Sequence, residues 1–232
     1  MPTITVDAIL FDMDGTLIDS TPGVLKAWST FAADYGLTNG AEIAHKSHGR
    51  RLYDTLKEWC QIDDEGKLQS EIVRFEDEVI EGGPVVLPGA LDLIHQATGR
   101  ATGSPSYGWT IVTSATNIYT PKALSRCGIH LPPAGPVTSN DVANGKPHPD
   151  PYLAGAKKCG VDPTKCLVVE DAPSGIKSGH AAGAQTLAVC TSHTRAALLE
   201  SGCNPDYIVN DLTKVSARWI EGKVEVTIDE SE

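Results

Sequence analysis

Hydrophobic positions along the chain follow two alternating patterns. Short, nearly continuous apolar runs predict buried strands, and stretches with apolar residues at helical spacing predict helices. The predicted strands cover residues 4–11, 109–113, 136–139, 166–169, 186–189 and 207–209. The predicted helices cover residues 90–98, 119–127, 151–159, 174–182 and 194–201. Strands and helices that alternate in this way predict an α/β fold with a Rossmann-like, doubly wound parallel sheet.

One segment departs from this alternation. Residues 22–86 contain only amphipathic helical patterns, at 24–35, 52–60 and 68–80. A Gly82-Gly83-Pro84 turn follows, and Leu87-Pro88-Gly89 leads back into the alternating part. We therefore expect a core of residues 1–21 and 87–232 with a helical cap inserted at 22–86; the alternative is two or three extra helices packed on the sheet. Residues 99–108 are polar and rich in turn formers, which predicts an exposed loop.

Two carboxylates follow the first predicted strand, in Asp12-Met13-Asp14-Gly15-Thr16. Gly15 permits a sharp turn that directs both acids to one site. An Asp carboxylate can attack phosphorus, and a second one can protonate the leaving oxygen and later deprotonate water. The alternative is an Asp-Gly turn in which Asp14 caps the next helix.

Three other polar groups belong to the loops that a parallel sheet gathers at one edge. Thr113-Ser114 closes a predicted strand, where a hydroxyl can hold a phosphate oxygen or cap a helix. Lys146 stands in a proline-rich loop, and its ammonium can neutralise a carboxylate and a phosphate or simply be solvated. Glu170-Asp171 follows another strand, as helix-capping acids or as metal ligands. Four carboxylates at one edge need a cation, and oxygen ligands alone favour Mg²⁺.

Charge and composition narrow the function. The net charge is −11, from 30 acidic and 19 basic residues, which disfavours nucleic acid and anionic membranes as partners. A phosphate site in such a chain must be made locally positive. No apolar run approaches the roughly 20 residues of a membrane helix, and no signal peptide is visible at the N-terminus. The six cysteines form no CxxC pair, which predicts reduced thiols and a cytoplasmic protein.

Taken in order, the four motifs resemble those of the haloacid dehalogenase-like (HAD) superfamily, and the segment 22–86 resembles its first type of helical cap. The resemblance implies that Asp12 is the nucleophile and a Mg²⁺ ligand. It implies that Asp14 is the general acid and base and binds the metal through its backbone carbonyl. A dehalogenase needs no acid at this second position, so the pair favours a phosphatase.

The same resemblance assigns the remaining motif residues. Thr113 and Ser114 would hold the phosphoryl group, and Lys146 would stabilise the nucleophile and the phosphate. Asp171 would bind the metal, with Glu170 beside it directly or through water.

A narrower resemblance is to the fungal 2-deoxyglucose-6-phosphate and glycerol-3-phosphate phosphatases. It rests on residues 45–51, 140–147, 169–176 and 203–216. It implies a small phosphorylated sugar or polyol as substrate. The cap residues His48, Arg50 and Arg51 would then contact this substrate; the alternative is that they form the charged start of a helix on the cap surface. We expect a monomer. A phosphomutase of the β-phosphoglucomutase type is the main alternative; a non-enzymatic regulator and a phosphonatase using Lys46 or Lys57 are weaker ones.

Overall fold

The computed structural model describes residues 1–98 and 107–231. Its centre is a parallel sheet in the order β5-β2-β6-β7-β8, which confirms the predicted fold class. The strands are β2 (Ala8–Phe11), β5 (Trp109–Ile111), β6 (Cys166–Glu170), β7 (Gln185–Val189) and β8 (Tyr207–Val209). The helices of the core are α5 (Ala90–Thr98), α6 (Tyr119–Arg126), α7 (Asp150–Cys159), α8 (Pro173–Ala181) and α9 (Arg195–Glu200).

Helices cover both faces of this sheet because successive strand residues point to opposite sides. Ile9 and Phe11 pack with the apolar residues of α5 and α6, whereas Ala8 and Leu10 pack with those of α7. All four of these side chains are fully buried. The strand leading to Asp12 is thus held from both faces.

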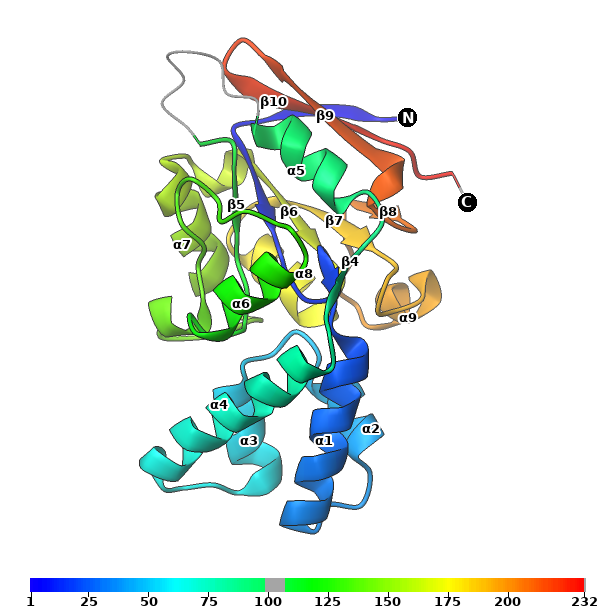
Figure 1. Cartoon of the computed structure of the whole chain (residues 1–232). Coiled ribbons are helices and arrows are strands. Elements are labelled where there is room, and N and C mark those ends of the chain that lie inside the picture. Colours follow the sequence, from blue (N-terminus) through cyan, green and yellow to red (C-terminus); the bar gives the residue numbers. More distant parts are fainter. Residues whose placement is uncertain (99–106, 232) are drawn as a thin grey trace.

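The first predicted strand, 4–11, is divided in the structure. Asp7 interrupts it, and β1 (Thr3–Val6) leaves the parallel sheet to pair with β10 (Lys223–Ile228), which also pairs with β9 (Val215–Ile220). This small antiparallel sheet lies at the end of the core farthest from the helices of residues 21–81, beside α5 (Figure 1). The hairpin β9–β10 was not predicted. The strand predicted at 136–139 is reduced to a single bridge between Val112 and Val137, followed by a 3₁₀ turn.

Residues 21–81 form the helical segment, with α1 (Thr21–Tyr35), α2 (Gly40–Ser47), α3 (Leu52–Cys60) and α4 (Glu65–Glu81). This segment lies next to the carboxyl edge of the parallel sheet (Figure 1). The antiparallel strands β3 (Ile18–Asp19) and β4 (Val85–Val86) connect it to the core. Helix α2 was not predicted. The exact cap boundaries, 22 and 86, stay a prediction. The loop predicted at 99–108 lies, apart from its last two residues, outside the described residues.

Within residues 1–98 and 107–231, no helix is both long enough and apolar enough to cross a bilayer. All six cysteines are free thiols, and five of them are buried.

Candidate active site

The carboxyl edge of the parallel sheet collects the predicted motifs. Asp12 follows β2, Thr113 follows β5, and Glu170 ends β6. Because β5, β2 and β6 are adjacent parallel strands, these three residues meet at the edge that faces the helical segment. The sequence motifs therefore converge on one place.

Lys146 connects the first and fourth motifs. Its ammonium donates to Asp12 Oδ1 at 2.6 Å, to Glu170 Oε1 at 2.8 Å and to the carbonyl oxygen of Val112 at 3.1 Å. Only 3% of the residue is exposed. Burial alone would lower the pKa of Lys146, but the carboxylates of Asp12 and Glu170 raise it above its ordinary value, so the side chain stays charged.

A third carboxylate, that of Asp171, lies beside the two that Lys146 contacts. Oxygens of Asp12, Glu170 and Asp171 lie within 4.8 Å of one another, and all three residues are buried. Burial raises the pKa of Asp12 well above its usual range; Lys146 opposes this, and Glu170 and Asp171 add to it. Oxygen atoms of this number and spacing fit a hard divalent cation, whose charge would balance the acids.

Glu170 already has a full set of protein donors. Its Oε2 accepts from the backbone N–H groups of Asp171 and Ala172, each at 2.8 Å. Its Oε1 accepts from Lys146 and from Tyr152 Oη, the latter at 3.1 Å. A Cβ atom added to Gly175 on α8 would lie 1.6 Å from Glu170 Oε1. The observed conformation of the Glu170 side chain therefore requires glycine at position 175.

The turn after β2 is built around Gly15. Its φ of +92° suits glycine, and a Cβ there would lie 2.0 Å from Asp171 Oδ2. The close approach also lets Thr16 Oγ1 donate to Asp171 Oδ1 at 3.3 Å. The turn is thus packed directly against Asp171.

Asp14 lies on the other side of this turn, toward α6. Tyr119 Oη donates to Asp14 Oδ1 at 2.9 Å. Burial raises the pKa of Asp14, although hydrogen bonds from Ser20 and Tyr119 oppose the shift. A carboxyl group in this environment can hold a proton nearer neutral pH than an exposed one.

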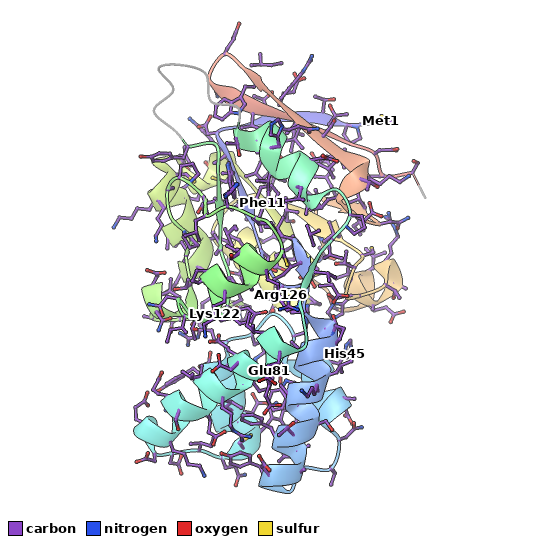
Figure 2. The ribbon with its side chains drawn as sticks, in the orientation of Figure 1. Met1, Phe11, His45, Glu81, Lys122 and Arg126 are labelled. Atoms are coloured by element: carbon purple, nitrogen blue, oxygen red, sulfur yellow. The ribbon has the colours of Figure 1, made fainter. Side chains whose placement is uncertain are left out.

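The second motif contacts the helical segment. Thr113 is 4% exposed, and its hydroxyl accepts from the N–H of Ala115 at 3.1 Å. Ser114 Oγ donates to the carbonyl oxygen of Gly49 at 2.8 Å. Another contact between the two parts joins Lys122 of α6 to Asp77 of α4 at 3.0 Å, and Lys122 faces that segment in Figure 2.

The three predicted cap residues have different positions. His48 Nε2 lies 2.6 Å from Asp171 Oδ2; burial opposes its charge, but Asp171 raises the pKa of His48 to about 9. Arg50 lines the site cavity and donates to Glu58 at 2.7 Å. Arg51 lies outside that cavity, where it pairs with Asp54 at 2.8 Å and donates to the carbonyl oxygen of Ala143 at 3.0 Å.

A cavity of about 110 Å³ separates the helical segment from the core at this point. Sequence reasoning missed several of its lining residues, among them Tyr119 and Glu76. Glu76 is 5% exposed, and Thr116 donates to its carboxylate through the backbone N–H at 2.9 Å and through the hydroxyl. A signal existed, because Glu76 occupies a position in the apolar stripe of the helix predicted at 68–80, between Phe75 and Val79.

A family model for haloacid dehalogenase-like hydrolases matches residues 6–183. The chain belongs to this family. Hexitol phosphatase A of Escherichia coli is 41% identical to this hydrolase over 184 residues, which cover 78% of this chain and 81% of the relative.

Two yeast proteins are similar over a larger share of the hydrolase. Glycerol-1-phosphate phosphohydrolase 2 of Saccharomyces cerevisiae is 35% identical over 214 residues, 87% of this chain and 82% of its own. The 2-deoxyglucose-6-phosphate phosphatase 1 of the same yeast is 31% identical over 245 aligned positions, 93% of this chain and 92% of its own. The resemblance to fungal phosphatases is therefore confirmed.

Proposed function

We propose that the protein is a Mg²⁺-dependent phosphatase that hydrolyses small sugar or polyol phosphate monoesters through an aspartyl-phosphate intermediate. The observation that carries this proposal is the pairing of buried Asp12 with Lys146 at 2.6 Å, with Asp14 two residues away beside the same cavity. Relatives whose printed names are polyol and sugar phosphatases support the substrate class.

In the first half-reaction, an oxygen of Asp12 attacks phosphorus and the bond to the substrate alcohol breaks. Asp14 donates its proton to the departing oxygen, which fits the raised pKa of this carboxyl group. In the second half-reaction, Asp14 takes a proton from water, and the resulting hydroxide attacks the phosphorus. The Asp12 carboxylate is then released with inorganic phosphate.

The charge of the phosphoryl group needs positive partners at the same edge of the sheet. We assign Lys146, Thr113 and Ser114 to its oxygens, with Lys146 also holding Asp12 in place. We assign Asp12, Asp171 and the Asp14 carbonyl to the metal, which when bound neutralises the phosphate and the acids around it. Since protein donors occupy both oxygens of Glu170, we propose that this residue acts on the site by holding Lys146 in place.

We also propose that the protein is a cytoplasmic monomer. Its six free thiols, five of them buried, support a reducing compartment. Sedimentation of the purified protein at several concentrations tests the oligomeric state.

Release of inorganic phosphate from a panel of sugar and polyol phosphates, with and without Mg²⁺, tests the proposed function. We expect hydrolysis by the wild type and a fall of at least about 10³-fold for Asp12→Asn. Isomerised sugar phosphate without free phosphate would indicate the phosphomutase instead. Undiminished hydrolysis by Asp12→Asn would overturn the assignment of the nucleophile.

A further inference from the structure

The cavity between α1–α4 and the core has mainly apolar walls on the side of the helices. They include Val24 and Trp28 of α1 and Phe75 and Val79 of α4. Polar side chains interrupt these walls, among them Ser47 at the end of α2 and Glu76 of α4. Neither belongs to the four sequence motifs, and the mechanism above uses neither.

Glu76 lines the same cavity as Asp14. Thr116 donates to its carboxylate, the backbone N–H of Tyr119 donates to Thr116 Oγ1 at 3.2 Å, and Tyr119 Oη donates to Asp14. This chain of contacts places Glu76 near Asp14, the residue that we assign to the departing oxygen. The negative charge of Asp14 also adds to the rise of the Glu76 pKa, which burial carries to about 7.

The Glu76 carboxylate has capacity for further donors. An ionised carboxylate offers about four lone-pair positions, and the contacts above, both from Thr116, occupy one on each oxygen. A buried carboxylate in an apolar wall is costly unless its acceptors are used. Substrate hydroxyl groups can supply the missing donors.

Ser47 supplies a second, independent observation. The residue is 7% exposed and lines the same cavity, and its hydroxyl has no hydrogen-bond partner within residues 1–98 and 107–231. Buried hydroxyl groups in native proteins almost always have a partner. A hydroxylated ligand in the cavity would provide one.

We propose that Glu76 and Ser47 form a subsite that binds the hydroxyl groups of an uncharged leaving alcohol and excludes leaving groups that carry a second negative charge. The proposal rests on the phosphatase function above and adds to it the residues that select the substrate. It assigns discrimination among phosphate esters to the helical cap rather than to the sheet edge.

Exclusion follows from the charges that line the cavity. Among the described residues that do so, only His48 and Arg50 have side chains that can carry a positive charge. Each already faces an acid, Asp171 at 2.6 Å and Glu58 at 2.7 Å. A carboxylate or second phosphate on the substrate would therefore meet Glu76 without a free counter-charge. Like charges brought together in a poorly solvated site repel strongly.

Three phosphate esters with the same three-carbon length separate these effects. Glycerol 1-phosphate carries two free hydroxyl groups, propyl phosphate carries none, and 3-phosphoglycerate carries a carboxylate. We expect wild-type kcat/KM to be highest for glycerol 1-phosphate, by about tenfold or more over each of the other two. Equal values for the three esters would overturn the proposal.

Glu76→Gln removes the charge and keeps the shape. We expect its preference for glycerol 1-phosphate over 3-phosphoglycerate to fall by about tenfold or more, and Ser47→Ala to lower the preference over propyl phosphate by about fivefold or more. Each preference is a ratio within one variant, so a partly unfolded sample does not change it. Glu81→Gln, which removes an exposed charge from the same helix, serves as the control and should keep wild-type ratios.

An unchanged ratio in Glu76→Gln, within about twofold of wild type, would overturn the proposal even if hydrolysis itself were robust. The proposed function is tested separately with p-nitrophenyl phosphate, which needs no alcohol hydroxyl groups. Asp12→Asn must abolish its hydrolysis. If Asp12→Asn remains active, the phosphatase mechanism fails, whereas the substrate ratios still report on the subsite.

Discussion

Replacing Gly175 by alanine tests how tightly Glu170 must be held. The added Cβ would lie 1.6 Å from Glu170 Oε1 and 2.0 Å from its carboxyl carbon. Because van der Waals contact begins at roughly 3.5 Å, the carboxylate must move by roughly 2 Å. Such a movement breaks some of the four hydrogen bonds that it accepts from Lys146, Tyr152 and two backbone N–H groups.

The expected free-energy change follows from these contacts. Hydrogen bonds to a charged group contribute about 1.5–3 kcal/mol each, so losing two costs about 3–6 kcal/mol. Alanine is favoured over glycine within a helix by about 1 kcal/mol. We therefore expect Gly175→Ala to lower the free energy of unfolding by about 2–5 kcal/mol, and to lower kcat because Lys146 loses a fixed partner.

Urea unfolding followed by tryptophan fluorescence measures the first effect, and release of p-nitrophenol measures the second. Gly66→Ala in α4 is the matched control, since its Cβ would come no closer than 3.4 Å to Asp64 Oδ1 and should leave stability equal or higher. In Glu170→Ala, the further change Gly175→Ala should cost nothing, because the clashing carboxylate is gone. Wild-type stability and kcat in Gly175→Ala alone would refute this reasoning.

Three further predictions concern charge. Lys146→Met leaves the carboxylates of Asp12 and Glu170 buried without their cation. It should lower kcat by at least about 10²-fold, as measured by steady-state kinetics, and the free energy of unfolding by about 3–5 kcal/mol, as measured by urea unfolding. Removing divalent ions with EDTA should abolish phosphate release, and added Mg²⁺ should restore it; full activity in EDTA would contradict the proposed cofactor. Since burial raises the pKa of Glu76 to about 7, its proton stabilises the folded state below about pH 4.5, and this contribution is lost as pH rises to about 7. Glu76→Gln should therefore gain stability relative to wild type between pH 5 and 8, by up to about 3 kcal/mol in thermal unfolding; a constant difference would argue against the shift.

Much of the core was predictable because its strands and helices differ in hydrophobic period. The parallel order then brought Asp12, Thr113 and Glu170 to one edge, as strand direction requires. Less predictable was the break at Asp7, since the apolar run continues across it and only the distant strand β10 draws β1 away.

The C-terminal hairpin carried a signal of another kind. Its strands alternate apolar and polar residues instead of forming continuous apolar runs, and Glu221 and Gly222 between them have φ of +51° and +82°, as a tight hairpin turn requires. The contacts of the helical segment could not be predicted, because the positions of Glu76 and Arg51 depend on how its helices pack against the rest of the protein. That packing involves residues far apart in sequence, such as Glu76 and Thr116.

The pairing of β1 with β10 has a consequence for synthesis on the ribosome. Thr3 lies opposite Thr227, so the first strand acquires its partner only after more than two hundred further residues have been made. At roughly 5–20 residues per second, this delay is about 10–45 s. During that time Ile4 and Val6, just ahead of the strand that leads to Asp12, lack the neighbours that cover them in the finished protein. Nascent chains arrested before β10 should therefore be more easily cleaved near their N-terminus than the full-length chain.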